Sequence, residues 1–196
     1  LFAGRVNKPN FSKLKLDLKG VYYISRIIKK AKIGDAAILK EIIEIFKKEG
    51  IKTISSTFFT PELNLSRGNY SRYKPDTVDK RDIKNTIKFL NKTKPYSHIQ
   101  GAVGRNNLVI PEKRKGTKSL LKNIKKQKNK NNGVLIKFPK KKQDSRIDLP
   151  TVGLNTLQQC KLAGLKGIVL KHKSNIFLDK ARSIKFANKN KLFIFV

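Results

Sequence analysis

The sequence has few of the residues that build several common kinds of site: one Cys, two His and no Met. A single cysteine, Cys160, excludes an internal disulfide framework and suits a reducing compartment. His98 and His172 have no ligand partners at the spacing of a metal site. There is no internal repeat, P-loop, CxxC or GxSxG pattern. With no signal peptide and no apolar run of the ~18 residues that a membrane span needs, we expect a soluble or membrane-peripheral protein.

Acidic residues are also scarce, at 13 Asp and Glu against 46 Lys and Arg, which gives a formal net charge of +33. Such a charge favours a nucleic-acid partner. However, 37 of the basic residues are Lys, whereas base recognition and bidentate phosphate contacts favour Arg. The lysines also occur in every segment. We therefore expect attraction to anionic surfaces and no nucleic-acid partner, with a non-catalytic RNA- or membrane-surface-binding protein as the alternative hypothesis.

The stretch 143–153 concentrates acidic residues in this basic chain. Asp144 and Asp148 lie four positions apart, with Arg146 between them, and the Thr151 hydroxyl follows. In an extended segment the two carboxylates and the guanidinium would point to one face, because side chains alternate with a period of two. Such a set suits a divalent cation or a phosphate ester. A solvated charged strand that ends in a proline turn is the plainer interpretation of the same residues.

This stretch, QDSRIDLPTVG, resembles the Q-D/E-x-R-V-DLPTIG motif of the LpxI-type UDP-2,3-diacylglucosamine pyrophosphatases of lipid A biosynthesis. Other segments are similar to motifs of that family in the same order along the chain: FAGxVxRP at 2–9, GDDALL at 34–39, EGF from Glu49, GQGAVV at 99–103 and GLAGI at 164–168. The resemblance therefore covers the whole chain. It departs from the family at Ala36, where the second acid of GDDALL is missing, and at Lys118, where the family has Asp after Gly-Thr.

The resemblance implies a two-domain α/β fold. We expect a truncated Rossmann-like N-terminal domain at 1–64, a linker at 65–75, and a smaller α/β C-terminal catalytic domain at 76–196 that carries the motif. We expect a fragment that lacks most of the amino-terminal half of the first domain, because the family begins with a strand and a Gly-rich turn. Stretch 143–151 is expected to line the cleft between the domains.

Hydrophobic periodicity, together with turn and cap residues, places the individual elements. Asp35 and Asp179 are expected as N-caps. The expected helices are 21–30, 36–48, 76–90, one starting at Thr117, 155–163, and one from Asp179 to Lys189. The expected strands are 1–3, 51–55, the hairpin 97–104 and 108–111 turning on 105–107, then 133–138, 167–170, 175–178 and 192–196.

The resemblance further implies that a water molecule hydrolyses the pyrophosphate of UDP-2,3-diacylglucosamine to UMP and 2,3-diacylglucosamine 1-phosphate. Asp148, which matches the aspartate of DLPT, is assigned to metal binding or water activation. Asp144 is the second catalytic and metal-binding candidate, with Mg²⁺ or another divalent cation as the cofactor. The candidate residues for binding substrate and phosphate are Arg146, Lys137, Lys140, Gln143, Thr151, Arg5 and Gln100.

The implied setting is the cytoplasmic surface of the inner membrane of a Gram-negative bacterium. The sequence leaves open whether the protein forms a homodimer. The two acids missing at Ala36 and Lys118 leave a second alternative, a diverged inactive member of the family.

Overall fold

The computed structural model describes residues 10, 13–93, 99–126, 132–140 and 144–196. The chain divides into two compact units. The first comprises Leu1–Phe59 with Asp144–Asp148, and the second Thr60–Gln143 with Leu149–Val196. The expected strand at 1–3 lies outside the described residues. The expected domain boundaries stay a prediction, as does a site in a cleft between domains.

The first unit is built on two helices that pack against each other, α1 (Leu18–Ala31) and α2 (Asp35–Lys48). Helix α1 is longer than predicted because Asp17 caps it, accepting a hydrogen bond of 2.7 Å from the backbone N–H of Gly20. Gly34 occupies the N-cap of α2, so the prediction of Asp35 as the cap was one residue too late. None of the described helices of the chain is long and apolar enough to cross a membrane.

The predicted strand at 51–55 is wrong, because these residues have no regular secondary structure. A strand needs a partner, and an isolated extended segment is not stable in water. The described residues of the first unit contain no strand beside this segment. The apolar alternation that predicted a strand here did not reveal whether a partner exists.

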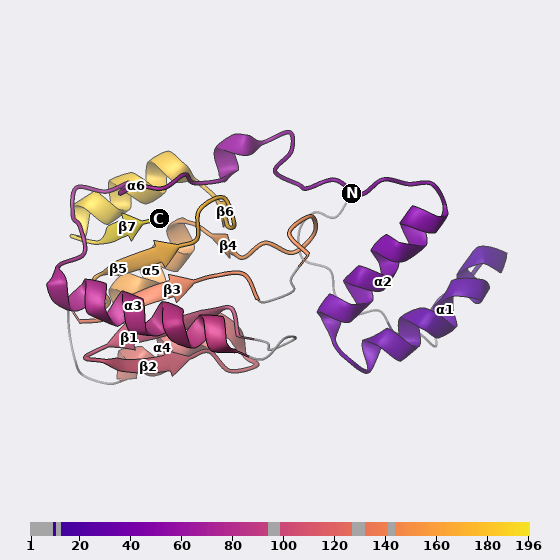
Figure 1. The fold of residues 1–196 in the computed structure, drawn as a ribbon, viewed down its shortest axis with the longest axis horizontal. Helices are drawn as coiled ribbons and strands as arrows, with labels where there is room; N and C mark the ends of the chain where they lie inside the picture. Colours follow the sequence, from indigo (N-terminus) through magenta and orange to yellow (C-terminus); the bar gives the residue numbers. More distant parts are fainter. Residues whose placement is uncertain (1–9, 11–12, 94–98, 127–131, 141–143) are drawn as a thin grey trace. The chain divides into compact units, whose positions relative to one another are not determined.

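The second unit is a five-stranded mixed sheet with the order β2-β1-β3-β5-β7 (Figure 1). Strand β1 is antiparallel to both of its neighbours, while β3, β5 and β7 run parallel. A two-stranded parallel sheet joins β4 to β6. This mixed sheet with flanking helices confirms the predicted α/β class. The strands are β1 (Gly101–Arg105), β2 (Leu108–Pro111), β3 (Val134–Lys137), β4 (Thr151–Val152), β5 (Gly167–Leu170), β6 (Ile176–Phe177) and β7 (Phe193–Phe195).

Helices cover both faces of the large sheet, because its strands are apolar on both sides. On β3, Val134 and Ile136 point to the face of α3 (Thr77–Lys92), while Leu135 points to the opposite face. That opposite face is covered by α4 (Gly116–Lys126), α5 (Leu154–Leu162) and α6 (Lys180–Lys189). Figure 1 shows α3 in front of the sheet and α4 behind it. The 3₁₀ turn η2 (Pro61–Leu63) precedes these elements. The result is a three-layer arrangement with a core on each side.

The predicted turn between β1 and β2 is confirmed. Asn106 and Asn107 both have positive φ, of 50° and 65°, as a two-residue hairpin turn requires. The buried carboxylate of Asp82 on α3 accepts hydrogen bonds from both backbone N–H groups, at 2.9 and 2.7 Å. Gly104 permits the close approach, since a Cβ there would lie 2.4 Å from the hydroxyl oxygen of Thr86. The hairpin is therefore fixed to α3.

Two further expectations concern the ends of the second unit. Asp179 stands at the N-cap position of α6, but its side chain makes no cap hydrogen bond, and its φ of 51° is left-handed. Its predicted role as a side-chain cap is therefore wrong. Residues 68–70, within the predicted linker, hydrogen-bond along the end of β7: Gly68 exchanges bonds with Val196, and Tyr70 N–H donates to Ile194.

Candidate active site

Residues Asp144–Asp148 form a turn. The carbonyl oxygen of Asp144 accepts from the N–H groups of Ile147 at 3.2 Å and Asp148 at 3.1 Å. The extended conformation in which both carboxylates and the guanidinium would share one face is therefore not adopted by this segment. The Asp144 side chain also accepts from the backbone N–H of Arg146, at 3.0 Å. Aspartate favours such turns because its short carboxylate competes for nearby backbone donors.

The first acid of the motif is held by the arginine between the two acids. Arg146 donates from Nε to Oδ1 of Asp144 at 2.9 Å and from Nη2 to Oδ2 at 2.6 Å, a bidentate pair. This hydrogen bonding lowers the pKa of Asp144 and raises the pKa of Arg146. Asp144 therefore stays ionised and engaged, which suits it to orienting Arg146 better than to accepting a proton.

The second acid, Asp148, differs from the first. Its side chain is half-buried, and within the described part of the chain no hydrogen bond or ion pair involves its carboxylate. Its own backbone is fixed by the turn, through the bond from its N–H to Asp144. A fixed backbone with an uncommitted carboxylate is what a metal ion or an attacking water would require of this residue.

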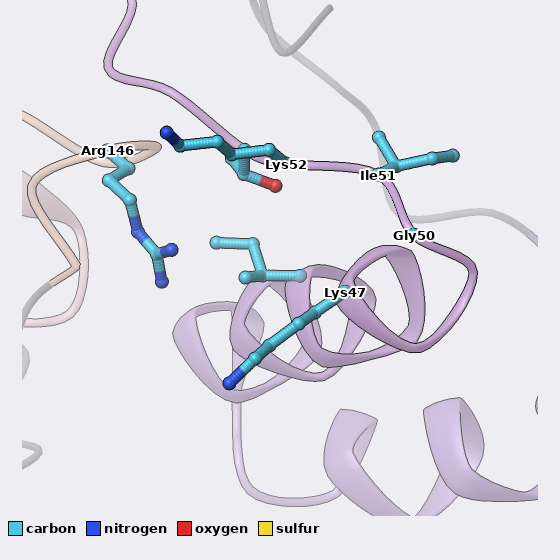
Figure 2. A pocket seen from close by; sticks show the side chains of 7 residues that line it. Lys47, Gly50, Ile51, Lys52 and Arg146 are labelled. Carbon is cyan, nitrogen blue, oxygen red and sulfur yellow. The ribbon is translucent and has the colours of Figure 1, made fainter.

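Arg146 also lines a pocket of the first unit, with a volume of about 260 Å³. Figure 2 shows its guanidinium together with the side chains of Lys47 and Lys52 around this pocket. Ile43 and Ile51 add apolar surface. Three cationic side chains around one hollow attract anions, phosphate groups among them.

A second polar cluster lies in the second unit, at the end of β3. The Lys137 ammonium donates to the Thr117 hydroxyl oxygen at 2.6 Å, and that hydroxyl donates to Oε2 of Glu112, also at 2.6 Å. Oε1 of Glu112 accepts from the backbone N–H of Gln100 at 2.8 Å. Lys137 and Glu112 are both buried, and their charged atoms are 4.0 Å apart. The cluster fixes a buried cation at the carboxyl end of a parallel strand, where ligands of α/β sheets bind.

The remaining predicted site residues are distributed as follows. Gln100 lies beside Glu112, and its side-chain oxygen is buried without a hydrogen-bond partner in the described chain. Lys140 is half-buried beyond the end of β3, and Thr151 begins β4 with its side chain exposed. Gln143 and Arg5 lie outside the described residues. The structure thus brings Gln100 and Lys137 together in the second unit, and Asp144 and Arg146 together in the first.

Comparison with known proteins decides the family. The LpxI N-terminal domain model matches residues 1–63, and the LpxI C-terminal domain model matches residues 66–195. The UDP-2,3-diacylglucosamine pyrophosphatase LpxI of Caulobacter vibrioides is 31% identical over 201 residues, which cover 98% of this chain and 72% of that protein. The chain belongs to the LpxI family. The family resemblance identified from the sequence motifs is confirmed.

Within this LpxI-family chain, three residues around Lys137 were not among the candidates chosen from the sequence: Glu112, Thr117 and Asn175. Thr117 accepts a hydrogen bond from the Lys137 ammonium and donates one to Glu112, whose carboxylate lies 4.0 Å from that ammonium. In the sequence, Thr117 belongs to the Gly-Thr pair that begins α4, and Glu112 lies five positions before it. Asn175 is buried, and its amide contacts the carbonyl of Lys137. The sequence placed it at the start of an expected strand, 175–178, and gave no sign of its contact with Lys137.

Three residues to which the sequence assigned no chemical part lie as follows. Cys160 is buried in α5, and burial raises the pKa of its thiol to about 12, so it stays protonated and unreactive. His172 is exposed, and His98 lies outside the described residues. Among the described residues, no group of three or more His, Cys, Asp or Glu side chains is arranged to hold a metal ion.

Proposed function

We propose that this protein hydrolyses the pyrophosphate bond of UDP-2,3-diacylglucosamine, releasing UMP and 2,3-diacylglucosamine 1-phosphate in lipid A biosynthesis. The observation that carries the proposal is the similarity to the Caulobacter pyrophosphatase along 98% of the chain. Both domain models of the family match, and the DLPT sequence at 148–151 is intact. The basic-binder alternative explains the charge but gives no reason for this match.

The reaction requires a water molecule to attack one phosphorus of the diphosphate. A new P–O bond forms as the bridging P–O bond breaks, and the proton of the water must pass to a base. Asp148 is the residue proposed for this task, because its carboxylate has no hydrogen-bond partner in the described chain. Positioned acid–base groups of this kind accelerate reactions by about 10²–10⁴-fold. Asp144, already bound to Arg146, is proposed to help through that arginine.

The developing negative charge on the phosphate oxygens requires cations held in place. Lys137 is proposed for this role, because Thr117 and Glu112 fix its ammonium. Arg146 and Lys140 are proposed as further phosphate contacts, and Arg146 shares its pocket with two lysines. Gln143, Thr151, Arg5 and Gln100 complete the proposed set for binding and orienting the substrate.

The two acids of the motif offer a divalent cation, for which Mg²⁺ is the first candidate, one carboxylate that is not already paired in the described chain, that of Asp148. Mg²⁺ binds through one or two carboxylates together with substrate phosphates and waters. Asp148 would serve as such a ligand, whereas Asp144 would have to release Arg146 to do so. When bound, the cation would neutralise charge on the diphosphate oxygens. Its requirement is tested by removing divalent cations.

The proposed setting is the cytoplasmic face of the inner membrane, where the lipid substrate resides. The net charge of +33 supports attraction to an anionic leaflet. Co-sedimentation with vesicles of increasing anionic lipid content, repeated at high salt, measures this attraction. Sedimentation equilibrium in the same buffer tests the homodimer.

Release of UMP from purified protein and UDP-2,3-diacylglucosamine tests the proposed function. We expect release with Mg²⁺, loss of release with a chelator, and recovery when Mg²⁺ is restored. Folded protein that binds the substrate without releasing UMP would indicate an inactive family member. Salt-sensitive RNA binding without any UMP release would favour the basic-binder alternative.

A further inference from the structure

Asn175 is a buried amide at the point where three segments of the second unit meet. The residue is 2% exposed and directly precedes β6. Oδ1 accepts from the backbone N–H of Lys171, just after β5, at 3.0 Å. Nδ2 donates to the carbonyl oxygen of Lys137, at the end of β3, at 3.1 Å, and lies 3.5 Å from the carbonyl oxygen of Pro150. One side chain thus contacts the ends of two strands and the loop before a third.

The backbone next to Asn175 holds the same loop. The N–H of Ile176 donates to the carbonyl of Pro150 at 3.1 Å, and the N–H of Leu178 donates to Val152 at 2.8 Å. These bonds form the parallel pairing of β4 with β6. Pro150 lies two residues after Asp148 in the DLPT sequence. These bonds therefore fix, within the second unit, the loop that follows Asp148 in the sequence.

The chemistry of the position calls for an amide. The site needs one acceptor, for Lys171 N–H, and one donor, for the Lys137 carbonyl, within a single short side chain. Asn provides both, whereas an ionised Asp provides acceptors only. A buried backbone group that loses its partner destabilises the local structure.

We propose that Asn175 is a positioning residue of the hydrolase: it holds the strand end that bears Lys137 and the Pro150 loop that follows Asp148 in one fixed arrangement. The proposal rests on the proposed function, because it assigns the consequence of this arrangement to the reaction. Displacing a reacting group by about 1 Å can cost about 10²-fold in rate, so a residue that only fixes backbone has a measurable effect on turnover.

The test compares two identical chemical changes, Asn175→Asp and Asn190→Asp. Both replace an amide that donates to a backbone carbonyl, since Nδ2 of Asn190 donates to Phe186 at 2.9 Å near the end of α6. Asn175→Asp keeps the shape and the acceptor for Lys171 but turns the donor toward Lys137 into an acceptor. We expect kcat for UMP release to fall about 10- to 100-fold, with KM changed less than about threefold. Asn190→Asp should leave both constants within about twofold of the parent.

Two further measurements distinguish a positioning role in the reaction from a merely structural role. Turnover is assayed well below the unfolding midpoint of each variant, so that loss of folded protein does not contribute. The Asn175→Asp change is then repeated in an Asp148→Asn background. If Asn175 acts through the loop of Asp148, its effect on kcat shrinks or disappears there, because residues that act as a unit are not additive. Full additivity would overturn the proposal.

Hydrogen exchange provides a readout that needs no turnover. We expect the amides of Ile176 and Leu178 to exchange faster in Asn175→Asp than in the parent and in Asn190→Asp. If the parent releases no UMP, the proposed function fails. The exchange result still tests whether Asn175 holds the Pro150 loop in place. If the parent is active and Asn175→Asp matches its kcat, the positioning role is wrong. Should Asn175→Asp fail to fold, Asn175→Ser, which keeps one donor and one acceptor, is judged by the same criteria.

Discussion

The ion pair of the motif in the first unit and the ion pair at the end of β3 in the second differ in burial. In the first, the Arg146 and Asp144 side chains are 45% and 22% exposed, and they bond to each other across a turn. In the second, the Lys137 and Glu112 side chains are 8% and 2% exposed, and Thr117 lies between them. A surface pair can release its arginine to an incoming phosphate at low cost. A buried pair cannot, so Lys137 is suited to act as a fixed positive charge.

The same difference appears in the apolar residues. Helix α1 of the first unit has no buried residue, and the described core of that unit rests on Ile43 and Ile45 of α2. The second unit has a core on each face of its sheet. Because burial of apolar side chains is the main stabilising term, we expect local opening to begin in the first unit.

The largest effect is expected at Asp148, the uncommitted carboxylate of the turn. Asp148→Ala should lower kcat for UMP release by about 10²–10⁴-fold, and by more if a metal ion is lost with it. Substrate affinity should change less, since a group that acts in the transition state contributes little to ground-state binding. Steady-state kinetics together with a direct binding measurement separate the two constants.

Asp144→Ala is the matched control in the same turn. It removes the partner of Arg146 but leaves Asp148 in place, so we expect a smaller loss of kcat. Hydrolysis by Asp148→Ala at the rate of the parent would contradict the central assignment. An equal loss in both variants would show that the paired acid matters as much as the uncommitted one.

The second prediction compares a buried and an exposed glutamate. Glu112→Ala leaves the Lys137 ammonium buried without its carboxylate and removes the acceptor of the Gln100 N–H. We expect a loss of about 3–5 kcal/mol in the free energy of unfolding, typical of removing one partner of a buried pair. Urea unfolding followed by circular dichroism measures it.

Glu49→Ala in the first unit is the control. Glu49 pairs with Lys19 and accepts a hydrogen bond from Tyr23 at 2.8 Å, but the pair lies on the surface. Exposed pairs contribute little, so we expect no measurable change in the unfolding midpoint. A comparable loss in both variants would remove the contrast between the units.

Much of the second unit could be predicted from the sequence. Its strands are apolar runs bounded by turn residues, and the helix expected from Asp76 is observed as α3, which begins with a capping box between Asp76 and Asp79. The strand expected at 51–55 failed because periodicity describes one segment and not its partner. Asp179 failed as a side-chain cap because a cap residue in the right place still needs the right backbone conformation, and φ here is 51°.

The part of the candidate site that is contiguous in the sequence could be predicted. The part that the fold assembles from distant residues could not. The motif at Asp144 and Asp148 was found, but its turn conformation was not, because a local bond from Arg146 N–H overrides the extended pattern. The links from Lys137 to Thr117 and Asn175 join residues 20 and 38 positions apart. Such contacts depend on strand order, which one sequence without relatives does not specify.

The third prediction concerns pH and Asp76 in the second unit. Hydrogen bonds from the Asp79 backbone and the Lys166 side chain lower the pKa of Asp76 to about 2. Its charge therefore stabilises the fold above pH ~4, the ordinary range for Asp, and this contribution is lost as pH falls toward 2. Asp76→Asn keeps the cap but removes the charge, so we expect a loss of a few tenths of a kcal/mol at pH 7.

Urea unfolding of the parent and of Asp76→Asn between pH 7 and pH 2 measures the effect. The difference between the two proteins should shrink as pH falls through this window. Lys166→Gln is the control, because it removes the cation that Asp76 contacts, and it should reduce the difference at pH 7. A difference that stays constant down to pH 2 would contradict the lowered pKa.

The last prediction concerns Asp179 and separates a true cap from a residue that only occupies the cap position. Asp17 caps α1 in the first unit through its carboxylate, whereas Asp179 makes no such bond and has a left-handed backbone. Asp17→Ala should therefore cost about 0.5–2 kcal/mol of stability. Asp179→Gly should cost nothing and stabilise by as much as ~1 kcal/mol, because glycine adopts a positive φ without strain. The backbone bond from Ser183 N–H to the Asp179 carbonyl, 2.8 Å long, survives either change. Thermal and urea unfolding of the two variants give the comparison. If Asp179→Gly loses as much as Asp17→Ala, the Asp179 side chain stabilises α6 after all, and the difference between the two caps disappears.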